Sequence, residues 1–127
     1  MSNYATENLR TLALVGHGSC GKTTLIEAML YRAGMIPEMG SIQRGTTMCD
    51  NDLLEKEVGH SIRLAVAHID TAMTDLTPVR IHILDTPGYP DYLGQDMSAL
   101  DAVKSVCAVI DPTKGPELLT RRLMAMA

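Results

Sequence analysis

The stretch GHGSCGKT at residues 16–23 places glycines, a lysine and a threonine at the spacing of the Walker A phosphate-binding loop. Glycines let the backbone turn tightly and bring its N–H groups to phosphate oxygens, and a helix that follows directs its positive dipole end at the same charge. Lys22 is placed to reach the β- and γ-phosphates of a nucleotide, and the Thr23 hydroxyl to bind Mg²⁺. The expected nucleotide-binding residues of this loop are Gly16, His17, Gly18, Ser19, Cys20, Gly21, Lys22, Thr23 and Thr24.

Two features of this stretch have a simpler alternative. A glycine turn before an ordinary helix, with an exposed lysine, would have the same local composition. Cys20 is either a reactive thiol at a helix N-terminus or a small side chain packed in the loop.

A second cluster follows an apolar run, where residues 80–88 read RIHILDTPG. Asp85 stands at the carboxyl end of the expected strand, which is where open α/β sheets bind their ligands. Its carboxylate can accept hydrogen bonds from a water molecule on Mg²⁺, and Gly88 can offer its backbone N–H to a γ-phosphate with no side chain in the way. By itself DTPG can also be a turn, because Asp, Pro and Gly all favour turns.

The elements that must position these residues follow from hydrophobic periodicity and from the Gly and Pro residues that interrupt it. Strands alternating with helices predict an α/β fold whose sheet is mostly parallel, with one antiparallel hairpin. In chain order we expect a strand at 10–15, a helix at 22–33, a long connection at 38–59, strands at 62–69 and 79–84, an amphipathic segment at 92–103, a strand at 105–110 and a helix from 117.

Composition restricts the class of protein. A chain of 127 residues with 46% hydrophobic content is enough for one domain with one core. Its net charge of -4 gives this chain alone no electrostatic reason to bind a phosphate backbone such as RNA. The 3 cysteines fit neither a disulfide framework nor a metal site, which favours a reducing, cytoplasmic compartment. No apolar run has membrane-spanning length and no signal peptide is recognisable, so we expect neither a membrane nor export.

The motifs together carry a resemblance. GHGSCGKT, the loop ending in GHSI, DTPGYPDY and ALDAVKSVCAVIDPTKGPE are similar to the start of the GTP-binding domain of elongation factor G and its elongation factor G-like relatives. The resemblance implies a P-loop NTPase three-layer sandwich that binds GTP and GDP with Mg²⁺ and hydrolyses GTP. It also implies that residues 38–61 form switch I, that switch II begins at Asp85, and that Ser61 stands where the family has its Mg²⁺-binding threonine. The ribosome is the implied partner, through a longer protein.

The sequence departs from the family pattern after DTPG. Ribosome-activated factors have a histidine there that positions the attacking water, whereas this chain has Tyr89. A phenol can donate or accept a hydrogen bond but cannot become an imidazolium at neutral pH. We therefore expect GTP binding to be retained and hydrolysis to be slow or differently triggered. Lys22, Gly88 and Tyr89 are the catalytic candidates, and Thr23, Ser61 and, through water, Asp85 are the metal-binding candidates.

The Asn-Lys-x-Asp motif that reads guanine is not among these 127 residues, so the chain is interpreted as a partial domain that holds the phosphate and Mg²⁺ half of the pocket. The strand at 105–110 would then have an open edge, which predicts self-association. Two other functions stay open. One is a non-catalytic module that binds a nucleotide or phosphate. The other is an ATP-using P-loop protein, which DTPG and the long switch I disfavour.

Overall fold

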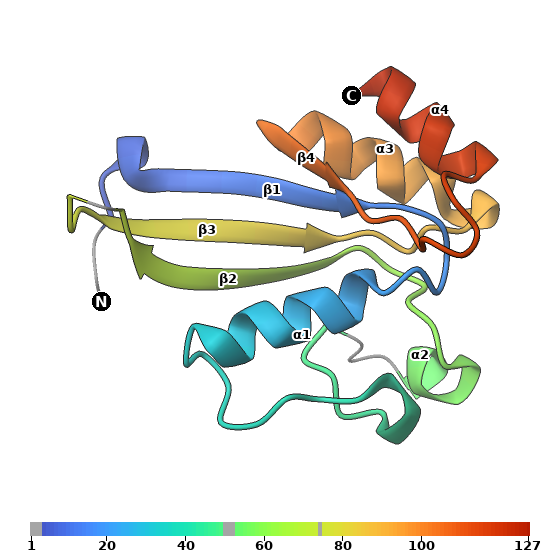
Figure 1. Cartoon of the computed structure of the whole chain (residues 1–127), viewed down its shortest axis with the longest axis horizontal. Helices are drawn as coiled ribbons and strands as arrows, with labels where there is room; N and C mark the ends of the chain where they lie inside the picture. The colour runs from blue at the N-terminus through green and yellow to red at the C-terminus, as the bar shows by residue number, and fades with distance from the viewer. Residues whose placement is uncertain (1–3, 50–52, 74) are drawn as a thin grey trace.

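A four-stranded sheet in the order β2-β3-β1-β4 forms the centre of the molecule (Figure 1). The computed structural model describes residues 4–49, 53–73 and 75–127. In the sheet, β1 is parallel to β3 and to β4, whereas β2 is antiparallel to β3. This confirms the predicted α/β class with its mostly parallel sheet and one antiparallel hairpin strand. The strands are β1 (Leu9–Val15), β2 (Ala65–Ala72), β3 (Pro78–Asp85) and β4 (Ser105–Ala108).

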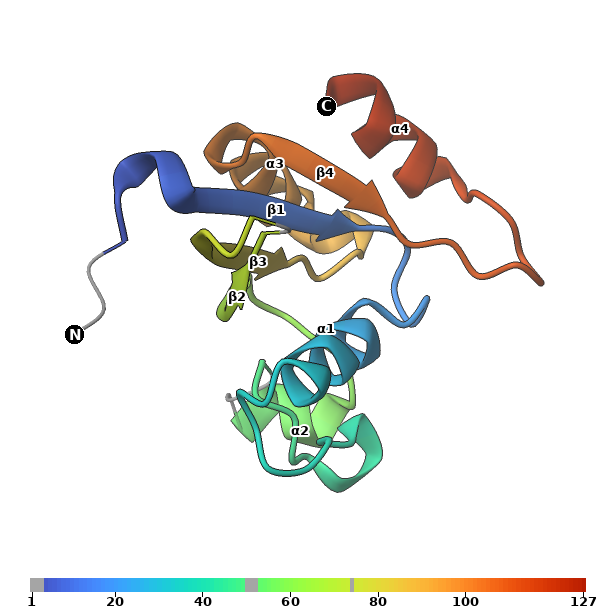
Figure 2. The same ribbon diagram turned by 60° about the vertical axis from the view of Figure 1, so that its left-hand side comes forward.

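Helices cover both faces of the sheet, which confirms the predicted three-layer sandwich. Helix α1 lies on one face, and α3 and α4 lie on the other (Figures 1 and 2). The α-helices are α1 (Lys22–Arg32), α2 (Leu53–Val58), α3 (Leu93–Ala102) and α4 (Leu118–Met126), and short 3₁₀ helices span Thr6–Asn8, Ile42–Arg44 and Pro90–Tyr92.

The carboxyl-terminal half of β1 is buried on both faces, because its side chains point alternately to opposite sides of the sheet and helices pack on each side. Leu14 belongs to the apolar cluster that includes Leu30 of α1. Its neighbour Val15 belongs to the opposite cluster, which includes Ala99 of α3 and Leu123 of α4. With both faces packed, β1 is fixed in the centre of the sheet, and its carboxyl end lies beside that of β3 (Figure 1). The two motifs that follow these strands therefore meet at one edge.

The expected strand at 62–69 begins only at Ala65 and runs to Ala72. The backbone N–H groups of Ile62 and Arg63 donate to the carboxylate of Glu55 instead of joining the sheet, with N···O distances of 2.9 and 3.0 Å. The early strand boundary was therefore wrong, because a buried side chain satisfies the backbone there.

The expected strand at 105–110 is also shorter, since β4 ends at Ala108. The long connection expected at 38–59 contains two short helices, Ile42–Arg44 and α2, which the sequence analysis did not predict. Strand β4 is the last strand of the sheet and pairs with β1 alone among the described strands. None of the helices in the described parts of the chain is long and apolar enough to cross a bilayer.

Helix α1 buries one charged side chain and exposes one apolar side chain, against its sequence pattern. Leu25 is 39% exposed, whereas Glu27 is only 1% exposed. Ile26 and Leu30 are buried as expected. A carboxylate can occupy such a position only if it is hydrogen-bonded, and the groups that bond to Glu27 come from the long connection.

Candidate functional site

The loop between β1 and α1 is closed by Lys22, whose side chain is 4% exposed. Its Nζ donates to the carbonyl oxygens of Gly16 at 3.1 Å and His17 at 3.0 Å, and it lies 3.9 Å from the Sγ of Cys20. These partners orient the ammonium group, but carbonyl oxygens do not neutralise its charge. The loop therefore contains a fixed positive charge that suits an anion such as a phosphate.

Three oxygen-bearing side chains from separate segments meet next to this lysine. The Thr23 hydroxyl donates to Oδ2 of Asp85 at 2.6 Å, and its oxygen lies 3.2 Å from the hydroxyl oxygen of Ser61. All three side chains are buried. Mg²⁺ prefers hard oxygen ligands, usually one or two carboxylates or hydroxyls with water and phosphate completing the shell. The residues predicted to hold Mg²⁺ thus form a donor set that fits it, and their role as ligands remains a prediction.

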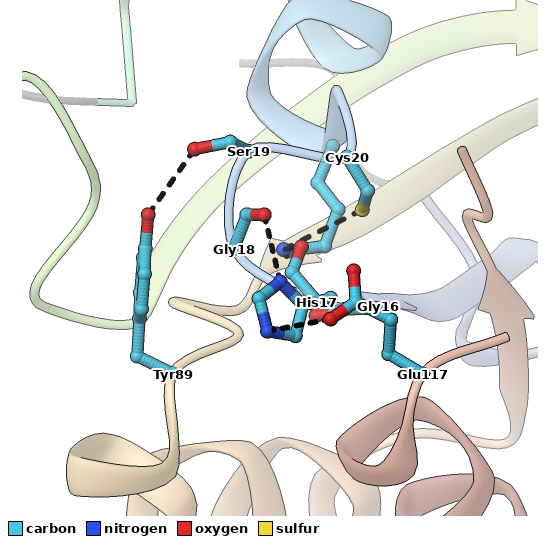
Figure 3. Close-up of polar contacts among 8 residues, drawn as sticks. Gly16, His17, Gly18, Ser19, Cys20, Tyr89 and Glu117 are labelled. Carbon is cyan, nitrogen blue, oxygen red and sulfur yellow. Dashed lines mark hydrogen bonds and ion pairs between the residues drawn. The ribbon is translucent and has the colours of Figure 1, made fainter. Parts of the chain in front are cut away.

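Tyr89 lies against the phosphate loop, as Figure 3 shows. Its hydroxyl oxygen is 3.2 Å from the hydroxyl oxygen of Ser19, and a Cβ atom added to Gly18 would overlap its ring. On its other side, the centroid of the His60 ring is 4.5 Å away. Tyr89 therefore contacts both the loop and the segment that leads to Ser61, and only glycine at position 18 leaves room for it.

Gly88 is also at a position that requires glycine. Its φ angle is +75°, and an added Cβ atom would overlap the carbonyl oxygen of Gly16 and the Nζ of Lys22. Its backbone N–H donates to Oδ1 of Asp96 on α3 at 3.4 Å. The backbone of Gly88 thus packs on the phosphate loop, while its N–H points at a carboxylate.

The other predicted loop residues are placed less centrally. His17 donates from Nδ1 to the carbonyl oxygen of Gly18 at 3.0 Å, and its Nε2 lies 3.0 Å from the carboxylate of Glu117, just before α4 (Figure 3). Cys20 is partly exposed. Thr24 is exposed on α1, and its side chain does not line the pocket beside the loop. That pocket is lined by Ser19, Gly21, Lys22, Thr23, Ile42, Gly59, His60, Ser61, Thr86, Pro87 and Tyr89.

Sequence analysis missed four side chains that hold the segments around this pocket. Glu27 accepts the N–H groups of Gly40 and Met48, which ties the long connection to α1. In the sequence, all four side chains share one signal: each is a polar residue on a helix face that packs on the rest of the molecule, where it needs a hydrogen-bond partner. The four are Glu27, Glu55, Gln95 and Asp96.

Gln95 of α3 binds the backbone that follows Ser61. Its Oε1 accepts the N–H of Leu64 at 2.6 Å, and its Nε2 donates to the carbonyl of Ile62 at 3.0 Å. These bonds fix the backbone that carries Ser61 into the pocket.

Comparison with known proteins follows the same motifs. Residues 7–127 match the family described as the Elongation factor Tu GTP binding domain. The chain belongs to this family. As a member, it is a GTP-binding domain of the translational GTPase class, which confirms the predicted resemblance and the enzyme class that it implies.

Several relatives of this GTP-binding domain share about a third of its residues. It is 36% identical over 112 residues to the tetracycline resistance protein TetM from transposon Tn1545 of Enterococcus faecalis, covering 88% of this chain and 17% of that protein. It is also 36% identical over 115 residues to an elongation factor G-like protein of Mycobacterium tuberculosis, covering 91% of this chain and 15% of the relative. The chain therefore spans about a sixth of the length of these relatives.

Solved structures show the same fold. A crystal structure of a Thermus thermophilus protein superposes with a TM-score of 0.84 at 35% identity, covering 93% of this chain and 17% of that one. A bacterial selenocysteine-specific elongation factor superposes with a TM-score of 0.69 at 25% identity over 93% of this chain and 17% of its own. The match to guanine-nucleotide proteins favours GTP over the alternative of an ATP-using P-loop protein.

Proposed function

We propose that this domain binds GTP and GDP with Mg²⁺ and hydrolyses GTP, as the nucleotide switch of a longer elongation factor G-like protein. The observation that carries the proposal is the convergence on Thr23, whose hydroxyl oxygen lies 2.6 Å from Asp85 and 3.2 Å from Ser61. These three residues come from the phosphate loop, switch I and the start of switch II, which are the segments that a GTPase uses to bind Mg²⁺ and phosphates.

In this proposal each residue has a defined task. Thr23 and Ser61 would hold Mg²⁺ directly and Asp85 would hold it through water, and the ion would neutralise part of the phosphate charge. Lys22 leaves the loop carbonyls and binds the β- and γ-phosphates, and the loop N–H groups receive the other phosphate oxygens. The γ-phosphate is then transferred to water by in-line attack, with its charge stabilised by Lys22 and by the N–H of Gly88.

The switch follows from the same contacts. Residues 38–61 and the segment from Asp85 are ordered when Ser61 and Gly88 engage the γ-phosphate side of the site, and both are released after hydrolysis. Glu27, Glu55 and Gln95 accept backbone N–H groups at both ends of this connection, which gives it a defined conformation.

Tyr89 favours a second candidate, a binding module that does not hydrolyse its nucleotide. The Tyr89 hydroxyl is 3.2 Å from Ser19, and the ring packs between Gly18 and His60. A side chain engaged in this way, with no imidazole, is poorly suited to orient an attacking water. The two candidates share the nucleotide and differ only in whether phosphate is released.

Two partners belong to the proposal. The ribosome would be contacted through the longer protein. A second copy of this chain would pair along the open edge of β4, where Cys107 is exposed. Sedimentation at the mass of a monomer at every concentration measured would rule out the second partner.

The proposal is tested by titrating fluorescent GTP, GDP and ATP analogues into the chain with and without Mg²⁺, while phosphate release is followed. We expect Mg²⁺-dependent binding that prefers guanine and that weakens by about ten- to a hundredfold in Lys22→Ala, because a charge-assisted contact to phosphate is lost. Lys104→Ala, at an exposed lysine before β4, is the matched control and should bind like the unaltered chain. Binding that is indifferent to Lys22 would refute the proposal, and binding without phosphate release would favour the second candidate.

A further inference from the structure

Asp96 of α3 is a buried carboxylate that the proposed mechanism does not use. Its side chain is 0% exposed. Oδ1 accepts the Gly88 N–H over a long 3.4 Å, and Oδ2 is buried without a hydrogen-bond partner among the described residues. Burial raises the pKa of Asp96 above its ordinary value, while the Gly88 N–H, the Thr86 hydroxyl and the charge of Lys22 act in the opposite direction. A carboxylate held so incompletely costs free energy, so its place in the core needs an explanation.

The Gly88 N–H supplies that explanation, because two acceptors compete for this single donor. In the proposed function, this N–H is donated to the γ-phosphate. In the structure it is donated to Asp96. Because the Cα of Gly88 already lies against Gly16 and Lys22 of the phosphate loop, the glycine needs no large displacement to reach a phosphate bound there. A reorientation of its peptide group is enough, and glycine has the conformational freedom to make it.

We propose that Asp96 is a positioning residue that lowers the affinity of the site for the nucleoside triphosphate relative to the diphosphate, by binding the Gly88 N–H that the γ-phosphate would otherwise receive. This inference rests on the proposed function. A diphosphate has no γ-phosphate, so it leaves the contact between Gly88 and Asp96 intact. A triphosphate must break it.

Charge acts in the same direction as this competition. Asp96 is close enough to Lys22 for the lysine charge to affect its ionisation. A γ-phosphate bound by the same lysine would therefore lie within the field of a buried anion, where repulsion is screened less than at the surface. Both effects are specific to the third phosphate. When Asp96 loses its charge, the repulsion disappears and the competition for the Gly88 N–H weakens.

The test compares the affinity of the chain for a non-hydrolysable GTP analogue with its affinity for GDP in Asp96→Asn and in the unaltered protein. Asparagine keeps the shape and one acceptor oxygen but removes the charge. We expect the analogue-to-GDP ratio of association constants to rise about tenfold, because the competing bond is charge-assisted but long. GDP affinity itself should stay within about twofold. Asp101→Asn, at an exposed aspartate of the same helix, is the charge-matched control and should leave the ratio unchanged.

A second readout covers a variant that folds poorly. In the unaltered chain, the amide resonance of Gly88 should move when the analogue is added and should stay close to its nucleotide-free position with GDP. An unchanged ratio in Asp96→Asn with normal GDP binding, or an equal change in Asp101→Asn, would overturn the inference alone. Failure of the unaltered chain to bind either nucleotide would overturn the proposed function, and the inference with it.

Discussion

Replacement of Glu27 by glutamine should loosen residues 40–48 without unfolding the domain. The two carboxylate oxygens of Glu27 accept N–H groups from Gly40 and Met48, which lie 13 and 21 residues further along the chain. Glutamine keeps the shape of the side chain, but its NH₂ group faces one of these donors and cannot accept a hydrogen bond. One charge-assisted bond is lost, and the other becomes neutral.

The expected cost follows from those two contacts. A hydrogen bond to a charged group contributes about 1.5–3 kcal/mol, and Glu27 is only 1% exposed, so water cannot replace the lost partner. If the cost falls on the opening of the segment between Gly40 and Met48, the open population rises by about ten- to a hundredfold, since each 1.4 kcal/mol is about tenfold. Arg44 is exposed in the middle of this segment and provides a tryptic site.

Limited trypsin digestion measures this opening when the segment closes faster than it is cleaved. Glu27→Gln should be cut after Arg44 about ten- to a hundredfold faster than the unaltered chain. Glu38→Gln, which changes an exposed glutamate near the same segment, should be cut at the original rate. Thermal unfolding of both variants checks that they fold. Equal cleavage rates for the two variants would show that Glu27 does not anchor the segment.

Two further predictions concern the site. Tyr89→His should raise the single-turnover rate of GTP hydrolysis at least about tenfold in the full-length protein bound to ribosomes, because an imidazole can orient and deprotonate water; an unchanged rate would contradict the role given to this position. Burial raises the pKa of Asp96 in the folded state above the ordinary 3.8. Protonation of Asp96 therefore stabilises the folded state at low pH, and this stabilisation is lost as pH rises through the raised pKa. Asp96→Asn should therefore be more stable than the unaltered chain at neutral pH, with a difference that vanishes toward pH ~4 in urea unfolding; a difference independent of pH would exclude this cause.

The parts of the fold that the sequence predicts are those encoded by local pattern. The phosphate loop lies between an apolar strand and a helix, and its glycines and lysine are adjacent in the chain, so its place at the end of β1 needs no long-range information. Asp85 is likewise predicted at the end of β3 because it follows an apolar run. Parallel pairing of the two strands then brings both motifs to one edge of the sheet.

The parts that sequence analysis missed depend on contacts between distant residues. Glu27 is buried because backbone N–H groups far along the chain bond to it, and periodicity alone assigns such a residue to the solvent. Residues 62–64 have the composition of a strand, but Glu55 and Gln95 take the N–H groups that a strand would use. Tyr89 was predicted to differ from a histidine in chemistry, whereas its packing on Gly18 required the folded loop.

Helix α3 contacts the two segments predicted to be switches through two adjacent residues. Gln95 binds the backbone of Ile62 and Leu64, just after Ser61, and Asp96 binds the N–H of Gly88. Adjacent residues of a helix point about 100° apart, so these two contacts extend in different directions from one rigid element. A rotation or shift of α3 that breaks one contact must also strain the other. If a γ-phosphate takes the Gly88 N–H, as the proposed function requires, Asp96 loses this contact, whereas the bonds of Gln95 to Ile62 and Leu64 do not depend on it. Helix α3 therefore connects the backbone that follows Ser61 with the backbone that follows Asp85.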